Sequence, residues 1–327
     1  NKELEVNPSN LTRRETSRGP ETKYTLAKTQ LYVDDCAQTF RHQSGGVVFN
    51  HMCNSFYLFS RVNKRLKLTL SEKGVIVANC LRLAKRLQSE LLQLHGIRYE
   101  IKKHTRDLGI SYTAGKYKPN QLFNSRFVGR QGRINKIGKL ARMHRNARNL
   151  YKGSGFSAST WGHQACGLTK SNMEMLERHG AKCSGINPAG RCRYSANCIA
   201  YGPYGHPKAR IIRETLNTFF QLTFEMLRNK QERDLREAWM IAKAQHDKLG
   251  TASIRGPLSV VIDMLKSLGW TPLSYNVWHT HEHNMSFIIN SKEQSTKTVI
   301  NALIDRCNSL DAERAQLHYC GEGMQGG

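Results

Sequence analysis

Two adjacent acidic residues, Asp34 and Asp35, stand in the segment LYVDDCA (31–37). The spacing of four apolar residues predicts a strand that ends at these aspartates, so that both carboxylates project from one tight hairpin turn; the four are Tyr24, Leu26, Leu31 and Val33. Two like charges held so close together are costly unless cations bind them. Mg²⁺ prefers carboxylate oxygens, and a pair of such ions can activate a hydroxyl nucleophile and neutralise a phosphate leaving group. The segment therefore predicts a site for Mg²⁺ or Mn²⁺; the alternative is an ordinary turn, in which aspartate is common.

The second chemical feature is a long stretch without acidic residues. From Leu108 to Met173 the chain contains no Asp or Glu, although it has 50 Lys and Arg and 25 Asp and Glu in all, for a net charge of +25. A charged helix face is usually only solvated, but such faces mix both signs to gain local ion pairs. We therefore expect this stretch to bind phosphates. The expected contacts are Arg126, Arg130, Arg133, Lys136, Lys139, Arg142, Arg145, Arg148 and Lys152.

A helix is expected to present these cations. Ile134, Ile137, Leu140, Ala141 and Ala147 fit one buried helical face, which leaves the basic residues on the exposed remainder. The Gly- and Ser-rich segment 153–159 is expected to close this helix.

Strands and helices alternate before the basic stretch. After a linker or truncated edge at 1–23, the periodicity predicts a helix from Val48 to Phe59, a hairpin over 66–79 with Lys73 in its turn, and a helix from Leu81 to Leu94. A strand is expected at 97–101. This alternation predicts an α+β fold with helices on one face of a sheet.

The second half of the chain is expected to be mostly helical. The predicted units are 24–115, a basic helical domain at 116–184, a helical connection at 185–250 with its helix at about 208–249, and a small α/β module at 251–327. In the last unit we expect helices near 257–267 and 293–308 with two strands between them.

The order of these motifs resembles the palm of reverse transcriptases. LYVDDCA (31–37) resembles the metal-binding hairpin, LTLSEKGVIVAN (68–79) resembles the next motif, and RDLGISYTAG (106–115) resembles the primer-grip turn with Leu108 and Gly109 at its tip. The basic helix, Trp161-Gly162 and GPLSVVIDMLKSLGW (256–270) are similar to divergent dinoflagellate reverse transcriptase-like proteins. The resemblance covers about residues 24–310, and it is specific at 31–37 and looser elsewhere.

The resemblance implies the C-terminal part of a right-hand polymerase, with palm and thumb. Asp34 and Asp35 would bind Mg²⁺ or Mn²⁺, Tyr32 would support the hairpin near the primer end, and Lys73 would lie beside the incoming nucleotide. The basic helix would be the thumb that holds an RNA/DNA primer-template while dNTPs are added.

The palm pattern is incomplete in this sequence. The family requires a third metal-binding aspartate from an earlier strand, and the only acidic residues before Tyr24 are Glu3, Glu5, Glu15 and Glu21. We therefore expect the fragment to be inactive by itself. The alternatives are a non-catalytic nucleic-acid-binding remnant and a basic RNA-binding protein.

Other groups of residues give weaker predictions. His179, Cys183, Cys192, Cys198 and His206 lack the close cysteine pair of zinc sites, so buried thiols are the favoured interpretation. The alternating His279, His281 and His283 fit an ordinary strand surface. Four aromatic residues interleave with the cations and either stack on bases or belong to the core: Tyr112, Tyr117, Tyr151 and Trp161.

The composition also favours an intracellular protein. The nine cysteines suggest reduced thiols, and the polar first residues lack the apolar core of a secretion signal, so we expect a nuclear or cytoplasmic location. No run of eighteen apolar residues is present, and no membrane partner is expected.

Overall fold

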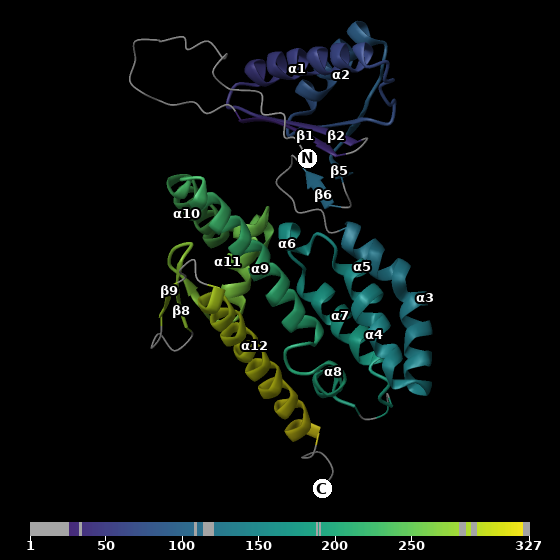
Figure 1. The fold of residues 1–327 in the computed structure, drawn as a ribbon, viewed down its shortest axis with the longest axis vertical. Helices are drawn as coiled ribbons and strands as arrows, with labels where there is room; N and C mark the ends of the chain where they lie inside the picture. The colour runs from purple at the N-terminus through teal and green to yellow at the C-terminus, as the bar shows by residue number, and fades with distance from the viewer. Residues whose placement is uncertain are drawn as a thin grey trace. The chain divides into compact units, whose positions relative to one another are not determined.

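A computed structural model describes residues 26–32, 35–107, 110–113, 121–187, 189, 191–280, 286–288 and 293–322. This part of the chain is mostly helical with a few short strands, consistent with the predicted α+β class. It divides into two compact units, the first containing the described residues up to Asp107 and the second those from Gln121 onward. The short strand β6 contributes residues to both. Figure 1 shows the elements of each unit.

The first unit begins with a β-hairpin. Strand β1 (Leu26–Tyr32) pairs antiparallel with β2 (Asp35–Arg41), and Tyr32 lies opposite Asp35. The strand and hairpin predicted here are confirmed. Val33 and Asp34, which connect the two strands, lie outside the described residues, and the side chains of Tyr32 and Asp35 are not described either.

Two helices follow the hairpin in the sequence. They are α1 (Gly45–Arg65) and α2 (Leu81–His95), which confirm the predicted periodicities. α2 ends at Gly96, whose φ of 69° requires the left-handed conformation that glycine adopts without strain. The apolar faces of the two helices form one core with a short strand and the loop after α2: Phe49, Ile76, Ala84, Leu87, Leu91 and Tyr99.

The hairpin predicted over 66–79 is wrong. Only β3 (Val75–Val77) forms a strand there, and it pairs in parallel with β4 (Glu100–Lys102) on the other side of α2 in the sequence. Leu68, which the predicted hairpin would have paired, is 57% exposed. The buried face of α2 explains the difference, because a helix that covers a sheet returns the chain parallel to the strand before it. The strand expected at 97–101 is correspondingly short.

Strands β5 (His104–Asp107) and β6 (Ile110–Thr113) are neighbours in a two-stranded sheet. They flank the predicted primer-grip tip, Leu108 and Gly109, which lies outside the described residues.

The second unit contains the basic helix and the helices that support it. In chain order its elements are α3 (Gln121–Met143), a 3₁₀ turn (Arg145–Ala147), α4 (Arg148–Leu150), a π-helical turn (Tyr151–Phe156), α5 (Ser157–Thr160), α6 (His163–Cys166), α7 (Lys170–Cys183), α8 (Arg193–Tyr201), α9 (Pro207–Arg228), α10 (Glu232–Leu249), a 3₁₀ turn (Gly250–Ser253), α11 (Pro257–Ser267), β7 (Thr271–Pro272), β8 (Val277–His279), β9 (Ser286–Ile288) and α12 (Glu293–Glu322).

The segment 153–159 does not close the basic helix, contrary to the prediction. The basic helix α3 ends earlier, at Met143, and His144 has an extended backbone. Residues 153–159 instead belong to a separate run of helical turns that includes the π-helical turn and α5, in which Gly155, Phe156 and Ser159 are buried.

The predicted C-terminal module packs with the helical connection in one core. Phe219 of α9, Trp239 of α10, Leu265 of α11, Trp278 of β8 and Leu303 of α12 belong to the same buried cluster. The helices expected at 208–249, 257–267 and 293–308 are present, the first as two helices and the last extended to Glu322.

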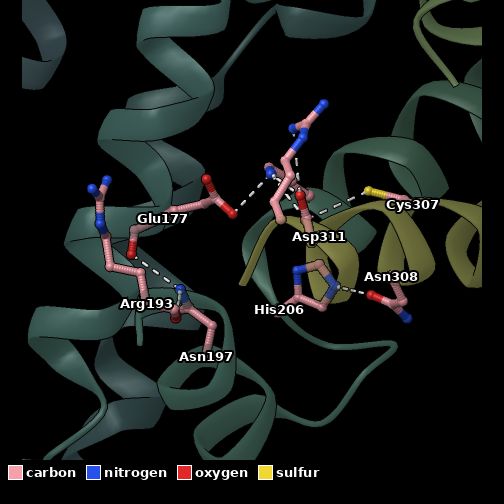
Figure 2. Close-up of polar contacts among 9 residues, drawn as sticks. Glu177, Arg193, Asn197, His206, Cys307, Asn308 and Asp311 are labelled. Atoms are coloured by element: carbon pink, nitrogen blue, oxygen red, sulfur yellow. Dashed lines mark hydrogen bonds and ion pairs between the residues drawn. The ribbon is translucent and has the colours of Figure 1, made fainter. Parts of the chain in front are cut away.

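A buried ion-pair network joins three helices of the second unit. The amine of Lys208, in the first turn of α9, lies 2.9 Å from the Glu177 carboxylate of α7 and 2.7 Å from the Asp311 carboxylate of α12. The side chains are 15%, 14% and 7% exposed, respectively. Figure 2 shows Glu177 and Asp311 directed toward this point from opposite helices, with His206 beside them bonded to Asn308 at 2.7 Å.

This network generates the first testable prediction. Lys208→Met would leave Glu177 and Asp311 buried without their counter-charge, so the free energy of unfolding should fall by about 3 to 5 kcal/mol. Urea unfolding followed by circular dichroism measures the change. The control is Arg178→Ala, which breaks the exposed pair with Glu174 and should cost less than about 1 kcal/mol. Equal losses in the two variants would contradict the prediction.

Candidate nucleic-acid interface

The cations of α3 form a row with a spacing of mostly three residues. The row runs through Arg130, Arg133, Lys136, Lys139 and Arg142. Each three-residue step falls about 60° short of a full helical turn, so the row crosses the exposed surface obliquely. Side chains three apart on a helix have Cβ atoms about 5–6 Å apart, which makes the row a dense line of positive charge.

The opposite face of α3 is apolar and buried. It consists of Phe123, Phe127, Ile134, Ile137 and Ala141. The buried face was therefore predicted correctly at three of its residues, Ile134, Ile137 and Ala141.

Two other residues of the predicted face lie differently. Leu140 is 44% exposed, because helical periodicity places it about 110° from the centre of the buried face. Ala147 is half-buried and lies in the 3₁₀ turn after the end of α3.

Helix α3 packs closely on α7. A Cβ atom at Gly138 would lie 2.9 Å from the Lys182 carbonyl oxygen, and one at Gly185, where φ is 81°, would lie 2.5 Å from the Ala141 carbonyl oxygen. Both positions therefore require glycine. Gly138 lies in α3 where it meets the end of α7, and Gly185 lies two residues after α7 ends.

Polar side chains also bridge α3 and α7 in this contact. His179 Nε2 and Gln131 Oε1 are 3.1 Å apart, and Lys182 Nζ donates to Asn135 Oδ1 at 2.6 Å. Asn135 also accepts from Gln131 at 2.9 Å. The polar residues of α3 at this contact are amides and not acids, so the bridge is made without any carboxylate near the cationic row.

The cations of the row lack counter-charges in the described part of the chain. Arg130, Arg133, Lys136, Lys139, Arg142, Arg145 and Arg148 form no ion pair with a described carboxylate. Burial and the nearby charge of Arg142 lower the pKa of Arg191, which shows that cations here face other cations. Unpaired charges of one sign favour a polyanion as the ligand.

The ends of the predicted row take part in the fold. Arg126 is half-buried and donates to the Trp161 carbonyl oxygen. Lys152 is half-buried, with its amine 5.5 Å from the centre of the Tyr201 ring. The exposed cations are Arg133, Lys136, Lys139 and Arg142 of the row and Arg145 in the 3₁₀ turn after α3.

One group of cations was missed by sequence analysis. Lys152, Arg210 and Arg213 line a cavity of about 490 Å³ together with Asn149, Gly153 and Gly205. Arg210 and Arg213 belong to α9, whose periodicity predicts core packing, and only the fold brings them beside Lys152. The sequence contains no local signal for this convergence.

The predicted catalytic residues belong to the first unit. Tyr32 and Asp35 are cross-strand partners, Lys73 lies in an exposed turn, and Asp34 lies outside the described residues. The metal site and the roles of these residues therefore stay predictions.

The Cys and His residues between 179 and 206 contact different helices. His179 and Cys183 face α3, where burial raises the pKa of Cys183 to about 12 and its thiol donates to the Ile134 carbonyl at 3.6 Å. His206 faces α12 instead. Among the residues that the structure describes, no three Cys, His, Asp or Glu side chains converge to hold a metal ion.

Two of the four aromatic residues can be assigned. Tyr151 is core, since it is buried and its hydroxyl donates to the Leu176 carbonyl at 2.9 Å. Trp161 is 60% exposed. Tyr117, like His281 and His283, lies outside the described residues, and the side chain of Tyr112 is not described.

Comparisons with protein-family models, curated proteins and solved structures find no match to the chain. None of the described helices combines the length and apolar character that a bilayer crossing requires.

The stability of the unit in which α7 packs against α3 should decrease at acidic pH. Burial, with a smaller effect of Lys182, lowers the pKa of His179 from 6.5 to about 4. The unfolded chain therefore binds a proton that the folded protein excludes, so stability should fall as the pH decreases from 6.5 to 4, by up to about 1.4 kcal/mol per pH unit. His179→Gln should remove this part of the slope, measured by urea unfolding at several pH values. His144→Gln, an exposed site, should keep the full slope; loss of slope there would contradict the assignment.

Proposed function

We propose that this protein binds double-helical nucleic acid through the cationic row of α3. The observation that carries the proposal is a helix with one apolar buried face and an exposed face whose cations form no ion pair with a described carboxylate. A duplex presents closely spaced phosphates, and neutralising them releases condensed counterions, which is favourable for any sequence. Contacts of this kind position the duplex without reading its bases.

We further propose that this binding serves RNA-directed DNA synthesis, with α3 as the thumb of a reverse transcriptase. Two observations support this role. A hairpin pairs Tyr32 with Asp35, and a second strand pair, β5 and β6, flanks Leu108 and Gly109. The helices α1 and α2 lie between them in the sequence, as the resemblance implies, whereas the Lys73 hairpin that it also implies is replaced by the parallel β3–β4 pair. In this role Asp34 and Asp35 hold Mg²⁺ or Mn²⁺, and Lys73 lies beside the incoming dNTP.

The second candidate function is nucleic-acid binding without catalysis. The positively charged face of α3 supports this function as strongly as it supports a polymerase thumb, because both need only a phosphate backbone as the ligand. The two candidates differ in the role of the hairpin, which holds the catalytic carboxylates in a polymerase and is only part of the fold in a protein that binds.

Binding should weaken steeply with salt. The slope of log affinity against log salt should be about −0.9 for each phosphate contacted on duplex DNA. Replacing the exposed residues Arg133, Lys136 and Lys139 together by Gln should make the slope shallower by about 0.9 for each phosphate that is no longer neutralised. Fluorescence anisotropy of a labelled duplex across a salt series measures both quantities.

The matched control removes charge elsewhere on the same unit. Arg233→Gln with Lys248→Gln neutralises two exposed cations of α10 and should leave the slope unchanged. A flat salt response of the unaltered protein, or equal effects of the α3 and α10 variants, would reject α3 as the interface.

A substitution in the hairpin should reduce catalysis without reducing duplex binding. In a protein that contains this chain together with the third palm aspartate, Asp34→Asn should lower primer extension at least about 100-fold, because a bound metal supplies several kcal/mol of transition-state stabilisation. Duplex affinity should stay nearly intact. Equal loss of extension and affinity, or no loss of extension, would reject the catalytic role and leave the binding role.

A further inference from the structure

A cavity of about 490 Å³ lies where the π-helical turn after α4 meets the first turns of α9. It is lined by six described residues, none of which is acidic. Three of them are the cations Lys152, Arg210 and Arg213, and the others are Asn149, whose amide can donate a hydrogen bond, and two glycines. All of the charge that lines this cavity is therefore positive.

Arg210 is fixed in the wall of this cavity by three contacts. Its guanidinium carbon lies 4.0 Å from the centre of the buried Phe156 ring, and its Nη atoms donate to the Lys152 carbonyl oxygen at 2.9 Å and to Glu214 at 3.1 Å. These bonds use two of the five N–H donors of a guanidinium, and the side chain is 23% exposed. Arg210 can therefore bond a ligand with little loss of side-chain freedom.

The other two cations have no counter-charge in the described part of the chain. Lys152 and Arg213 are half-buried and form no ion pair with a described carboxylate. Among the described residues, only Glu214 forms an ion pair with a cation of the cavity, so three positive charges and one negative charge leave a net charge of +2. Like charges held together in this way are costly unless an anion binds them.

A tight turn brings the cations of α9 beside Lys152. The backbone amides of Gly205 and His206 donate to the Gly202 carbonyl oxygen at 3.0 and 3.2 Å, directly before α9 begins. A Cβ atom at Gly205 would overlap the Tyr201 carbonyl oxygen, so this turn requires glycine. The backbone therefore sets the position of the cavity, which does not arise from flexible surface side chains alone.

The cationic row of α3 leads toward this cavity. Arg145 and Arg148 follow the row in the sequence, and Lys152 comes four residues after Arg148. Burial raises the pKa of Tyr201 and the charge of Arg148 opposes this effect, so Arg148 lies near the ring that the Lys152 amine approaches to 5.5 Å. A strand whose phosphates follow the row can therefore end at the cavity.

The geometry points to a subsite for the terminal phosphate of a nucleic-acid strand, bound by Lys152, Arg210 and Arg213. This subsite rests on the proposed function, because the strand that ends in it belongs to the duplex on α3. The volume of about 490 Å³ holds the phosphate and part of the nucleotide that carries it.

A terminal phosphate suits this cavity better than an internal phosphodiester. A phosphate monoester carries a charge of about −1.5 to −2 near pH 7, which matches the net charge of the cavity, whereas a diester carries a single charge. Its free oxygens also fit the planar donors of a guanidinium, which bind phosphate in pairs. A diester continues into a sugar on both sides, so it suits the open row on α3 instead.

The experiment compares DNA duplexes of identical sequence in which one strand ends in a hydroxyl, a 5′ phosphate or a 3′ phosphate. Fluorescence anisotropy measures the affinity for each duplex. The unaltered protein should bind at least one phosphorylated duplex about 10- to 100-fold more tightly than the hydroxyl duplex, because hydrogen bonds between charged groups are the strong ones. The end that is preferred identifies the strand end that the subsite takes.

Three variants and a control test the residues of the subsite. Arg213→Gln should remove most of the preference for the phosphorylated end and leave the affinity for the hydroxyl duplex nearly unchanged, whereas Arg213→Lys keeps the charge and should retain part of the preference. Lys152→Gln should lower the ratio of the two affinities as well. The matched control is Lys139→Gln, which removes a cation of the row and should weaken binding of all the duplexes by the same factor. Circular dichroism shows whether each variant is folded.

The outcomes separate this inference from the proposed function. Equal affinity of the unaltered protein for hydroxyl and phosphorylated ends, or equal loss of the preference in Arg213→Gln and Lys139→Gln, would overturn the subsite and leave duplex binding standing. Displacement of the phosphorylated duplex by an equimolar deoxynucleoside 5′-monophosphate would also overturn it, because the cavity would then take a free nucleotide instead of a strand end. Salt-independent binding of all the duplexes would instead reject the proposed function on which the subsite rests.

Discussion

The buried amine of Lys208, held between the carboxylates of Glu177 and Asp311, is the contact on which the second unit depends. A cation in the first turn of α9 is opposed by the helix dipole, and burial lowers its pKa. The two carboxylates more than offset both effects, since the net pKa of Lys208 is raised. The three charges satisfy one another only when α7, α9 and α12 are all in place. The network therefore fixes α7, and α7 in turn supports α3.

This arrangement separates the positive surface from the acids that could neutralise it. The row on α3 cannot be held by ion pairs without losing its charge, so α3 is held from its other face. That face uses apolar side chains, the close approach at Gly138, and neutral polar bridges through Gln131 and Asn135. Two acids of the unit, Glu177 and Asp311, instead stabilise its interior.

The sequence predicts the features that depend on local periodicity. The apolar residues of α1, α2 and α3 recur at helical spacing, and these helices were predicted from it. The strand and turn around Asp35 follow from alternation and turn residues in the same way. These elements are specified by residues a few positions apart.

The features that depend on distant partners could not be predicted. Residues 66–79 contain two apolar segments around a turn, and only the buried face of α2 decides that Val75–Val77 pairs with Glu100–Lys102. His163 and Glu214, whose side chains approach to 3.8 Å, are 51 positions apart, and Arg213 meets Lys152 only through the fold.

The hairpin register links the two proposals for this protein. Because Tyr32 pairs with Asp35, Asp34 is one of only two residues between the strands, and a slip of one position would exchange the faces of every side chain in β2. A polymerase depends on that register in particular, because a metal pair requires carboxylates at fixed positions, and it also needs a grip that ignores sequence while the duplex moves.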